Sequence, residues 1–211
     1  MDLKIDLDLY KQGRLHWREV SSKALLVGPP GTGKTTFARA LANTLQIPLL
    51  ATSAATWLQR GHLGDVLERM SDAFEEARDL APCILFLDEV DGLGHRHAHG
   101  EYMDYWNNIV NRALELLDGI AKSEGVVVLG ATNRVGHIDH ALLRSGRLEK
   151  RFDISLPSIE ALAGIFRTHL GDDIEPLIQS ALPFLAADSR EELHESDGRG
   201  DWSPTVRSRL N

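Results

Sequence analysis

One short segment limits the fold of this chain more than any other. The glycine-rich stretch GPPGTGKT, residues 28–35, lies between the apolar run KALLV and the start of a helical pattern. In that context glycines let backbone N–H groups close around an oxyanion, and the helix N-terminus adds the positive end of its dipole. The segment therefore predicts a phosphate-binding P-loop within an α/β fold.

Each residue type in this loop suits a nucleoside triphosphate and its metal ion. The glycines allow backbone angles that other residues avoid. Lys34 is a mobile positive charge for the β- and γ-phosphates, and the hydroxyl of Thr35 is a ligand for Mg²⁺. The alternative is a glycine-rich turn without a ligand. The predicted nucleotide-binding residues are Gly28, Pro29, Pro30, Gly31, Thr32, Gly33, Lys34, Thr35 and Thr36.

Apolar runs and helical patterns alternate along residues 23–157. Runs that are apolar throughout and separated by helices indicate a parallel sheet covered on both faces. We therefore predict an α/β fold, a three-layer α/β/α sandwich with five parallel strands. The predicted strands are 23–27, 48–52, 83–87, 125–131 and 151–157, and the main helices 35–45, 64–80 and 102–117, with a short helical turn at 141–144.

Two adjacent carboxylates end the third predicted strand, in the stretch ILFLDE. Asp88 would lie at the carboxyl edge of the sheet, where open parallel sheets bind ligands, and would meet the metal held by Thr35. Glu89 is then free to act as the general base on a water molecule. The alternative is a pair of solvated acids. The pair favours an ATPase that activates water itself, so we predict ATP and Mg²⁺ as the bound species.

Composition excludes several other classes of protein. The 211 residues carry a net charge of −8, which disfavours nonspecific nucleic-acid binding. The single cysteine, Cys83, excludes an internal disulfide framework and a cysteine-based zinc cage, and its apolar surroundings indicate a core residue. No targeting segment is evident, and no apolar run approaches the roughly 20 residues that span a bilayer. We therefore expect a soluble, cytoplasmic protein.

Four segments carry a family resemblance in the same order and spacing. They are GPPGTGKT, EEARDLAPCILFLDEVDGLG, VVVLGATNR and IDHALLRSGRLEKRFDISLP. Residues 23–157, about two-thirds of the chain, resemble the AAA (AAA+) ring ATPases, with segments similar to both the membrane-anchored AAA metalloproteases and the katanin/spastin group. The resemblance implies Mg-dependent ATP hydrolysis by a ring of identical subunits, a hexamer, that remodels or unfolds protein substrates.

The same resemblance assigns catalytic roles beyond Lys34 and Glu89. Asn133, in GATNR, matches the family's sensor residue, although a cap on a helix or turn is the alternative. Arg147 matches the arginine finger, which stabilises transition-state charge at the ATP of the neighbouring subunit. The second finger position falls on Lys150, which lacks the planar fork of arginine. Arg144 and Arg151 would then be ordinary surface charges.

The loop that grips polypeptide in this family matches His62, Leu63 and Gly64. Histidine replaces the usual large aromatic residue there and offers weaker apolar grip. A second loop carries three histidines. They either face the central pore of the implied ring or form a metal site with a fourth ligand. These residues are His95, His97 and His99, with Glu101 as the fourth ligand.

Other parts of the chain depart from the family pattern. The domains are predicted as an N-terminal arm at 1–22, a large ATPase subdomain at 23–157, a partial helical lid at 158–187 and a disordered tail at 188–211. The arm matches no family segment and is either a helix or loosely packed. HExxH is absent, so no protease activity is expected. Two functions remain open: a ring ATPase, or a truncated or degenerate nucleotide-binding subunit with a regulatory or assembly role.

Overall fold

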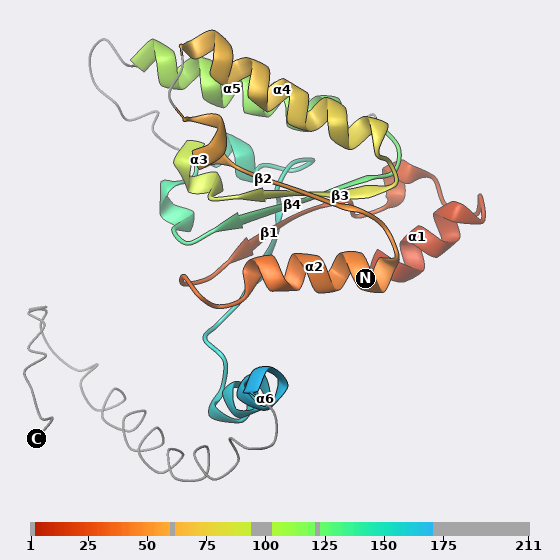
Figure 1. The fold of residues 1–211 in the computed structure, drawn as a ribbon. Coiled ribbons are helices and arrows are strands. Elements are labelled where there is room, and N and C mark those ends of the chain that lie inside the picture. Colours follow the sequence, from red (N-terminus) through yellow and green to blue (C-terminus); the bar gives the residue numbers. More distant parts are fainter. Residues whose placement is uncertain (1–2, 60–61, 94–102, 121–122, 171–211) are drawn as a thin grey trace, which may run out of the picture. The chain divides into compact units, whose positions relative to one another are not determined.

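The apolar runs form one parallel sheet in the computed structural model, which describes residues 3–59, 62–93, 103–120 and 123–170 (Figure 1). The strand order is β2-β3-β4-β1-β5, and every neighbouring pair is parallel. The strands are β1 (Lys23–Val27), β2 (Leu49–Ser53), β3 (Cys83–Asp88), β4 (Val126–Thr132) and β5 (Lys150–Asp153). The prediction of five parallel strands is confirmed, although β5 ends four residues earlier than expected.

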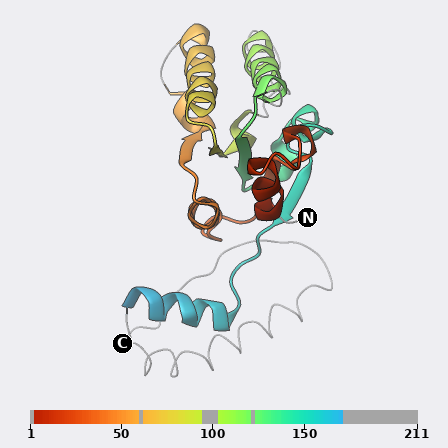
Figure 2. The same cartoon turned by 90° about the vertical axis from the view of Figure 1, so that its right-hand side faces the viewer.

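The sheet is covered on both faces, as the unbroken apolar runs of β3 and β4 require. Helices α4 and α5 lie on one face, and α1 and α2 lie on the other (Figures 1 and 2). Two separate clusters of buried side chains fill the two layers between helices and sheet. The bounds are α1 (Leu3–Lys11), α2 (Lys34–Leu45), α4 (Leu63–Asp79) and α5 (Met103–Ile120). The three-layer sandwich is confirmed.

The N-terminal arm forms part of one of these layers. Its helix α1 and a 3₁₀ turn at Trp17–Glu19 place Leu7, Trp17 and Val20 in the apolar cluster beneath α2. The Tyr10 ring meets Trp17 edge-on, at 5.1 Å between ring centroids, and the Tyr10 hydroxyl donates to Glu124 Oε2 at 2.9 Å. In the described part of residues 1–22, residues 3–11 are helical and pack against the sheet layer through Leu7.

Four further short helices lie between the strands and the main helices in the described residues before 157. Ser53 caps an unexpected helical turn, α3, by accepting a hydrogen bond from the backbone N–H of Thr56 at 3.1 Å. The predicted turn near residues 141–144 is the 3₁₀ helix η4. The bounds are α3 (Ala54–Trp57), η2 (Val90–Leu93), η3 (Val135–His137) and η4 (His140–Leu143).

Contacts divide the chain into two compact units, residues 1–156 and residues 157–211. In the second unit, α6 (Ile159–Leu170) lies within the predicted helical lid, and the Ser158 hydroxyl accepts from the N–H of Ala161 at 3.2 Å. The rest of the predicted lid, from residue 171, and the predicted tail lie outside the described residues. Within the described ranges, no helix combines the length and hydropathy needed to cross a membrane.

Candidate nucleotide site

A pocket of about 380 Å³ opens at the carboxyl edge of the sheet. Strands β3, β4 and β1 are neighbours, so the segments that follow them meet at this edge. The structure brings together the P-loop, the acidic pair and the sensor position. The lining residues are Pro30, Gly31, Gly33, Lys34, Thr35, Thr36, Asp88, Glu89 and Asn133.

The glycines of the loop are needed for two different reasons. Gly31 and Gly33 have φ angles of +79° and +87°, in the left-handed region that favours glycine. Gly28 does not share that conformation. A Cβ atom there would lie 2.1 Å from the carbonyl oxygen of Ile154, just beyond β5. The prediction that Gly28 is needed for an uncommon backbone angle is therefore wrong. Glycine is required at this position because another backbone lies too close for a side chain.

The ammonium of Lys34 is held inside the pocket by three oxygens. Its Nζ donates to the carbonyls of Gly28 and Pro29 at 2.7 and 2.9 Å, and to Asn133 Oδ1 at 2.7 Å. Lys34 is 8% exposed, because it begins α2 at the base of the loop. The contact joins the P-loop to the end of β4 and places two predicted catalytic residues in direct contact.

The predicted metal ligands also meet. The Thr35 hydroxyl donates to Asp88 Oδ2 at 3.4 Å, and Asp88 is partly buried. Mg²⁺ prefers oxygen ligands and is usually bound by one or two carboxylates together with substrate phosphates and water. A hydroxyl and a carboxylate beside a phosphate-binding loop fit that ion. Elsewhere in the described part of the chain, no cluster of three or more His, Cys, Asp or Glu residues could hold a metal.

Glu89 has an uncommon backbone conformation. Its φ is +54°, in the left-handed region, and such a non-glycine residue costs on the order of 1–3 kcal/mol. Its N–H donates to Asp88 Oδ1 at 2.9 Å, and its carbonyl accepts from Gly92. The strained residue is exposed and lines the pocket, which is where a general base would meet water.

A buried contact that the sequence analysis did not anticipate connects the two halves of the pocket. The Thr132 hydroxyl donates to Asp91 Oδ1 at 2.7 Å and accepts from the Arg134 N–H at 2.9 Å. Thr132 is fully buried and immediately precedes Asn133, whereas Asp91 lies two residues after Glu89. The contact therefore links the segments that carry these two residues. In the sequence, the only sign of this contact was the acidic residue Asp91 in the stretch VDG.

Arg147 lies apart from this pocket, in a close ion pair within its own subunit. Its Nε and Nη2 donate to the two carboxylate oxygens of Asp118 at 2.8 and 2.7 Å, and Nη1 donates to the Ala141 carbonyl at 2.8 Å. The hydrogen bond to Asp118 raises the pKa of Arg147 despite some opposing effect of burial. Two parallel bonds of this kind fix the guanidinium in one plane.

The strand register places Arg147 near the amino ends of the strands, whereas its own P-loop lies at their carboxyl ends. Lys150 begins β5 beside Ala24, near the start of β1, while the P-loop follows the end of β1. Four residues of extended strand separate Ala24 from Gly28, about 13 Å. Arg147 precedes β5 and is not among the residues that line the pocket.

The remaining predicted residues occupy separate positions. His62 directly precedes α4, its N–H donating to Asp65 Oδ2 at 2.7 Å, and Leu63 and Gly64 belong to the first turn of α4. Arg151 pairs with Asp153 of its own strand, at 2.5 Å from Nη2 to Oδ1. Lys150 starts β5 and Arg144 is exposed. The three histidines and Glu101 lie outside the described residues.

Comparison with known families decides the identity of this domain. Residues 24–156 match the model described as "ATPase family associated with various cellular activities (AAA)". The chain belongs to the AAA family. The AAA domain is thus an ATPase, and the matched range contains four complete strands, β1 from its second residue, and the pocket described above.

Similar proteins extend the likeness over more of the chain. The "ATP-dependent zinc metalloprotease YME1 homolog" of Caenorhabditis elegans is 35% identical over 196 residues, covering 90% of this chain and 27% of that protein. "ATP-dependent zinc metalloprotease FtsH 3" of Sphaerobacter thermophilus is 37% identical, covering 82% and 36%. "ATP-dependent zinc metalloprotease FtsH" of Acidothermus cellulolyticus is 43% identical, covering 69% and 22%. The AAA chain therefore spans between about a fifth and about a third of the length of these relatives.

Proposed function

We propose that this AAA domain is the Mg-dependent motor of a ring, a hexamer of identical subunits, that uses ATP hydrolysis to remodel or unfold proteins. Lys34, Glu89 and Asn133 act on ATP bound in their own subunit. Arg147 acts on ATP bound in the neighbouring subunit. The family and the similarity to ATP-dependent metalloproteases support this proposal.

The contacts in the pocket support these roles. Lys34 would exchange its oxygen partners for the β- and γ-phosphates, and Thr35 and Asp88 would hold Mg²⁺, which would supply positive charge to neutralise the phosphates. Glu89 takes a proton from the water that attacks the γ-phosphorus, and Asn133 holds that water through its amide. The products are ADP and phosphate, and Glu89 returns its proton to solvent.

One observation carries the ring proposal. Most of the predicted catalytic residues lie at the carboxyl ends of the strands, whereas Arg147 lies near the amino ends. The pocket contains the P-loop and the acidic pair, while Arg147 lies near the start of β1. A second copy of the chain, placed with its Arg147 facing the pocket, completes the site. This heterologous contact, repeated around an axis, closes into a ring.

The first test measures ATPase rate against protein concentration. We expect a rate per subunit that rises as subunits assemble and disappears with EDTA. Glu89→Gln should retain ATP binding and lose turnover. Arg147→Ala should lower kcat by about 10³-fold or more with similar ATP affinity, while Arg144→Ala, an exposed arginine in the same loop, should leave it unchanged. A rate independent of concentration and unaffected by Arg147→Ala would contradict the assembly.

The second candidate is a nucleotide-binding subunit with a regulatory or assembly role and little hydrolysis. Histidine at position 62, where the family has a large aromatic residue, favours it, because imidazole gives a weaker apolar grip on a polypeptide. Tight ATP binding without turnover at any concentration would support this candidate. If the ring does act on protein through His62, Leu63 and Gly64, His62→Phe should increase substrate-stimulated ATPase.

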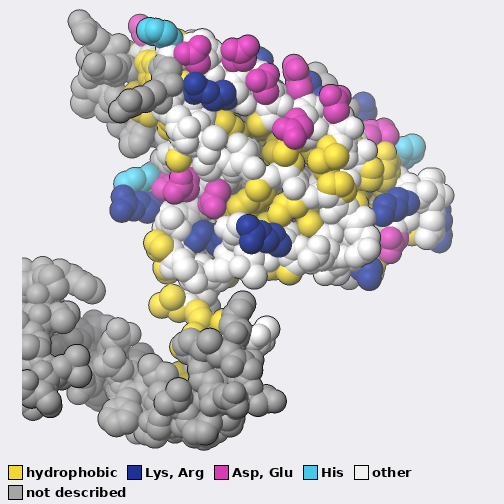
Figure 3. Space-filling view, in the orientation of Figure 1, with side chains coloured by type: hydrophobic (Ala, Val, Ile, Leu, Met, Phe, Trp, Pro, Cys, Tyr) yellow, Lys and Arg dark blue, Asp and Glu magenta, His cyan; other side chains and the backbone are white. Residues whose placement is uncertain are grey.

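The surface charge supports a protein substrate over a nucleic acid. Exposed acidic side chains gather along α4, on the face shown in Figure 3, and the whole chain carries a net charge of −8. Phosphate backbones bind basic surfaces. A cytoplasmic location stays a prediction, based on the single buried cysteine. The exposed acidic residues of α4 are Glu68, Asp72, Glu75, Glu76 and Asp79.

A further inference from the structure

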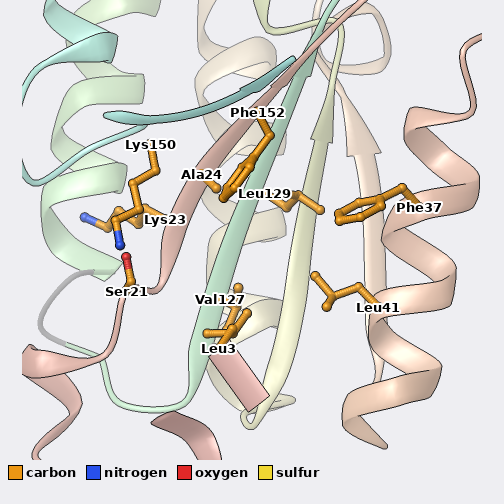
Figure 4. Close-up of a pocket in the computed structure, with 10 residues that line it drawn as sticks. All are labelled: Leu3, Ser21, Lys23, Ala24, Phe37, Leu41, Val127, Leu129, Lys150 and Phe152. Atoms are coloured by element: carbon orange, nitrogen blue, oxygen red, sulfur yellow. The ribbon is translucent and has the colours of Figure 1, made fainter. Parts of the chain in front are cut away.

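Lys23 is a buried cation in a strand that is otherwise apolar. It begins β1 and is 9% exposed. Its Nζ donates to the carbonyl of Leu117 at 2.8 Å and to the carbonyl of Gly146 at 2.5 Å. Figure 4 shows its side chain directed toward α5 and away from the apolar residues of the adjoining pocket, such as Phe37 and Phe152. The ammonium therefore fastens three segments together: β1, the last turn of α5, and the loop before β5.

The two carbonyls bound by Lys23 each immediately precede a member of the Arg147–Asp118 ion pair. Leu117 is followed by Asp118 in α5, and Gly146 is followed by Arg147. Gly146 has a φ of +81°, which bends the loop at this point. Lys23 thus holds the backbone on both sides of the ion pair, from the strand that leads directly into the P-loop.

Charge around Lys23 matters as well as hydrogen bonding. Burial lowers the pKa of Lys23, the negative charge of Asp118 opposes that effect, and the positive charge of Arg147 adds to it. The charges of Asp118 and Glu149 both act on Lys23, and Asp118 also accepts hydrogen bonds from Arg147. When Arg147 leaves Asp118, Lys23 loses a repulsive neighbour and remains close to the carboxylate, which lowers the free energy needed to separate the ion pair.

We propose that Lys23 is a positioning residue for Arg147, one that keeps the loop backbone in place while the guanidinium moves from Asp118 to the ATP of the neighbouring subunit. The proposal rests on the proposed function, because it requires Arg147 to act across a subunit interface. A buried lysine with only a structural role would stabilise the fold without affecting Arg147. The distinction is that positioning acts from the subunit that supplies the arginine, not from the subunit that hydrolyses ATP.

Mixed assemblies separate these roles. A donor chain with Glu89→Gln supplies Arg147 but does not hydrolyse ATP, and an acceptor chain with Arg147→Ala hydrolyses ATP but supplies no arginine. We expect each alone to be nearly inactive and the mixture to regain activity. Adding Lys23→Met to the donor should lower the kcat of the mixture roughly tenfold or more, with an unchanged KM, because a displaced catalytic group loses rate steeply. Adding it to the acceptor should change the rate less than about twofold, within the usual effect of a distant contact.

Two further variants keep the result interpretable. Lys23→Arg retains a cation and several donors and should restore part of the rate. Lys23→Gln retains a donor without the charge and should give an intermediate rate. It replaces Lys23→Met if the chain with Lys23→Met binds ATP differently from the same chain without it. Equal losses from donor and acceptor would overturn the positioning role in favour of a structural one. An inactive mixture of the two parent chains would instead refute the trans action of Arg147, and the role of Lys23 with it.

Discussion

At the scale of single residues, the pocket depends on contacts between side chains to which the sequence analysis assigned no role. Thr132 and Asp91 join the segment that carries Glu89 to the one that carries Asn133. Glu89 and Asn133, the proposed catalytic residues, are exposed, so their orientation depends on the backbone that Thr132 and Asp91 hold. The Thr132 hydroxyl satisfies two groups at once, a carboxylate oxygen and a backbone N–H.

Thr132→Val tests this contact with little change in side-chain volume. The change leaves Asp91 Oδ1 and the Arg134 N–H without their shared partner, so we expect a loss of roughly 1–3 kcal/mol in unfolding free energy. We also expect kcat to fall more than ATP affinity. Urea denaturation and steady-state kinetics measure the two effects. Thr44→Val, whose exposed hydroxyl donates to the Ala40 carbonyl at 2.8 Å, is the matched control and should change neither.

At the scale of elements, the P-loop is held against the end of the edge strand β5. The N–H of Ile154 donates to the Val27 carbonyl at 2.7 Å, and the N–H of Gly28 donates to the Thr132 carbonyl at 3.2 Å. These bonds continue the sheet to the first residue of the loop. The two backbones approach so closely that no side chain fits at Gly28.

Gly28→Ala should therefore displace the loop from β5. We expect a loss of roughly 1–3 kcal/mol in stability, the usual cost of overpacking, together with a large loss of ATP affinity. Nucleotide titration of the purified variant and thermal unfolding measure both. Gly136→Ala is the control, because an added Cβ there meets no atom within 4 Å. Normal ATP affinity in Gly28→Ala would show that the approach to Ile154 is not required.

At the scale of the whole molecule, the sandwich needs residues that precede the family motifs. Residues 1–156 form one compact unit, and the N-terminal arm contributes Leu7, Trp17 and Val20 to the core under α2. The family model begins at residue 24, so this cover comes from a segment that the motifs do not include. The limits of the predicted domains beyond this unit stay predictions.

Two leucine-sized residues of α1 provide a matched test of the arm. Leu7 is 3% exposed, whereas Ile5 on the same helix is 56% exposed. Leu7→Ala should lower the unfolding free energy by about 2–5 kcal/mol, and Ile5→Ala should change it by less than about 0.5 kcal/mol. Chemical denaturation of the chain ended at Leu156 should give the same difference. Equal and small effects would show that the arm does not belong to the cooperative unit.

The sequence alone predicted the five parallel strands, the main helices and the position of the P-loop. Local information was sufficient because a buried parallel strand reads as an apolar run, and because the P-loop places its ligating groups within eight consecutive residues. The meeting of Asp88 and Asn133 with that loop followed from a general rule, since the carboxyl ends of parallel strands share one edge of a sheet.

Only the tertiary structure decided which residues contact the proposed catalytic groups and the segments that carry them. Thr132 and Asp91 are 41 residues apart, Arg147 and Asp118 are 29 apart, and Lys23 and Gly146 are 123 apart. No periodicity or motif connects such positions. Strand register and helix packing bring them within hydrogen-bond distance, and at buried Thr132 and Lys23 an unpaired polar group would be costly. The physical reason is that the motifs specify a ligand locally, whereas the position of Arg147, Lys23 and the space at Gly28 depend on how distant backbones pack.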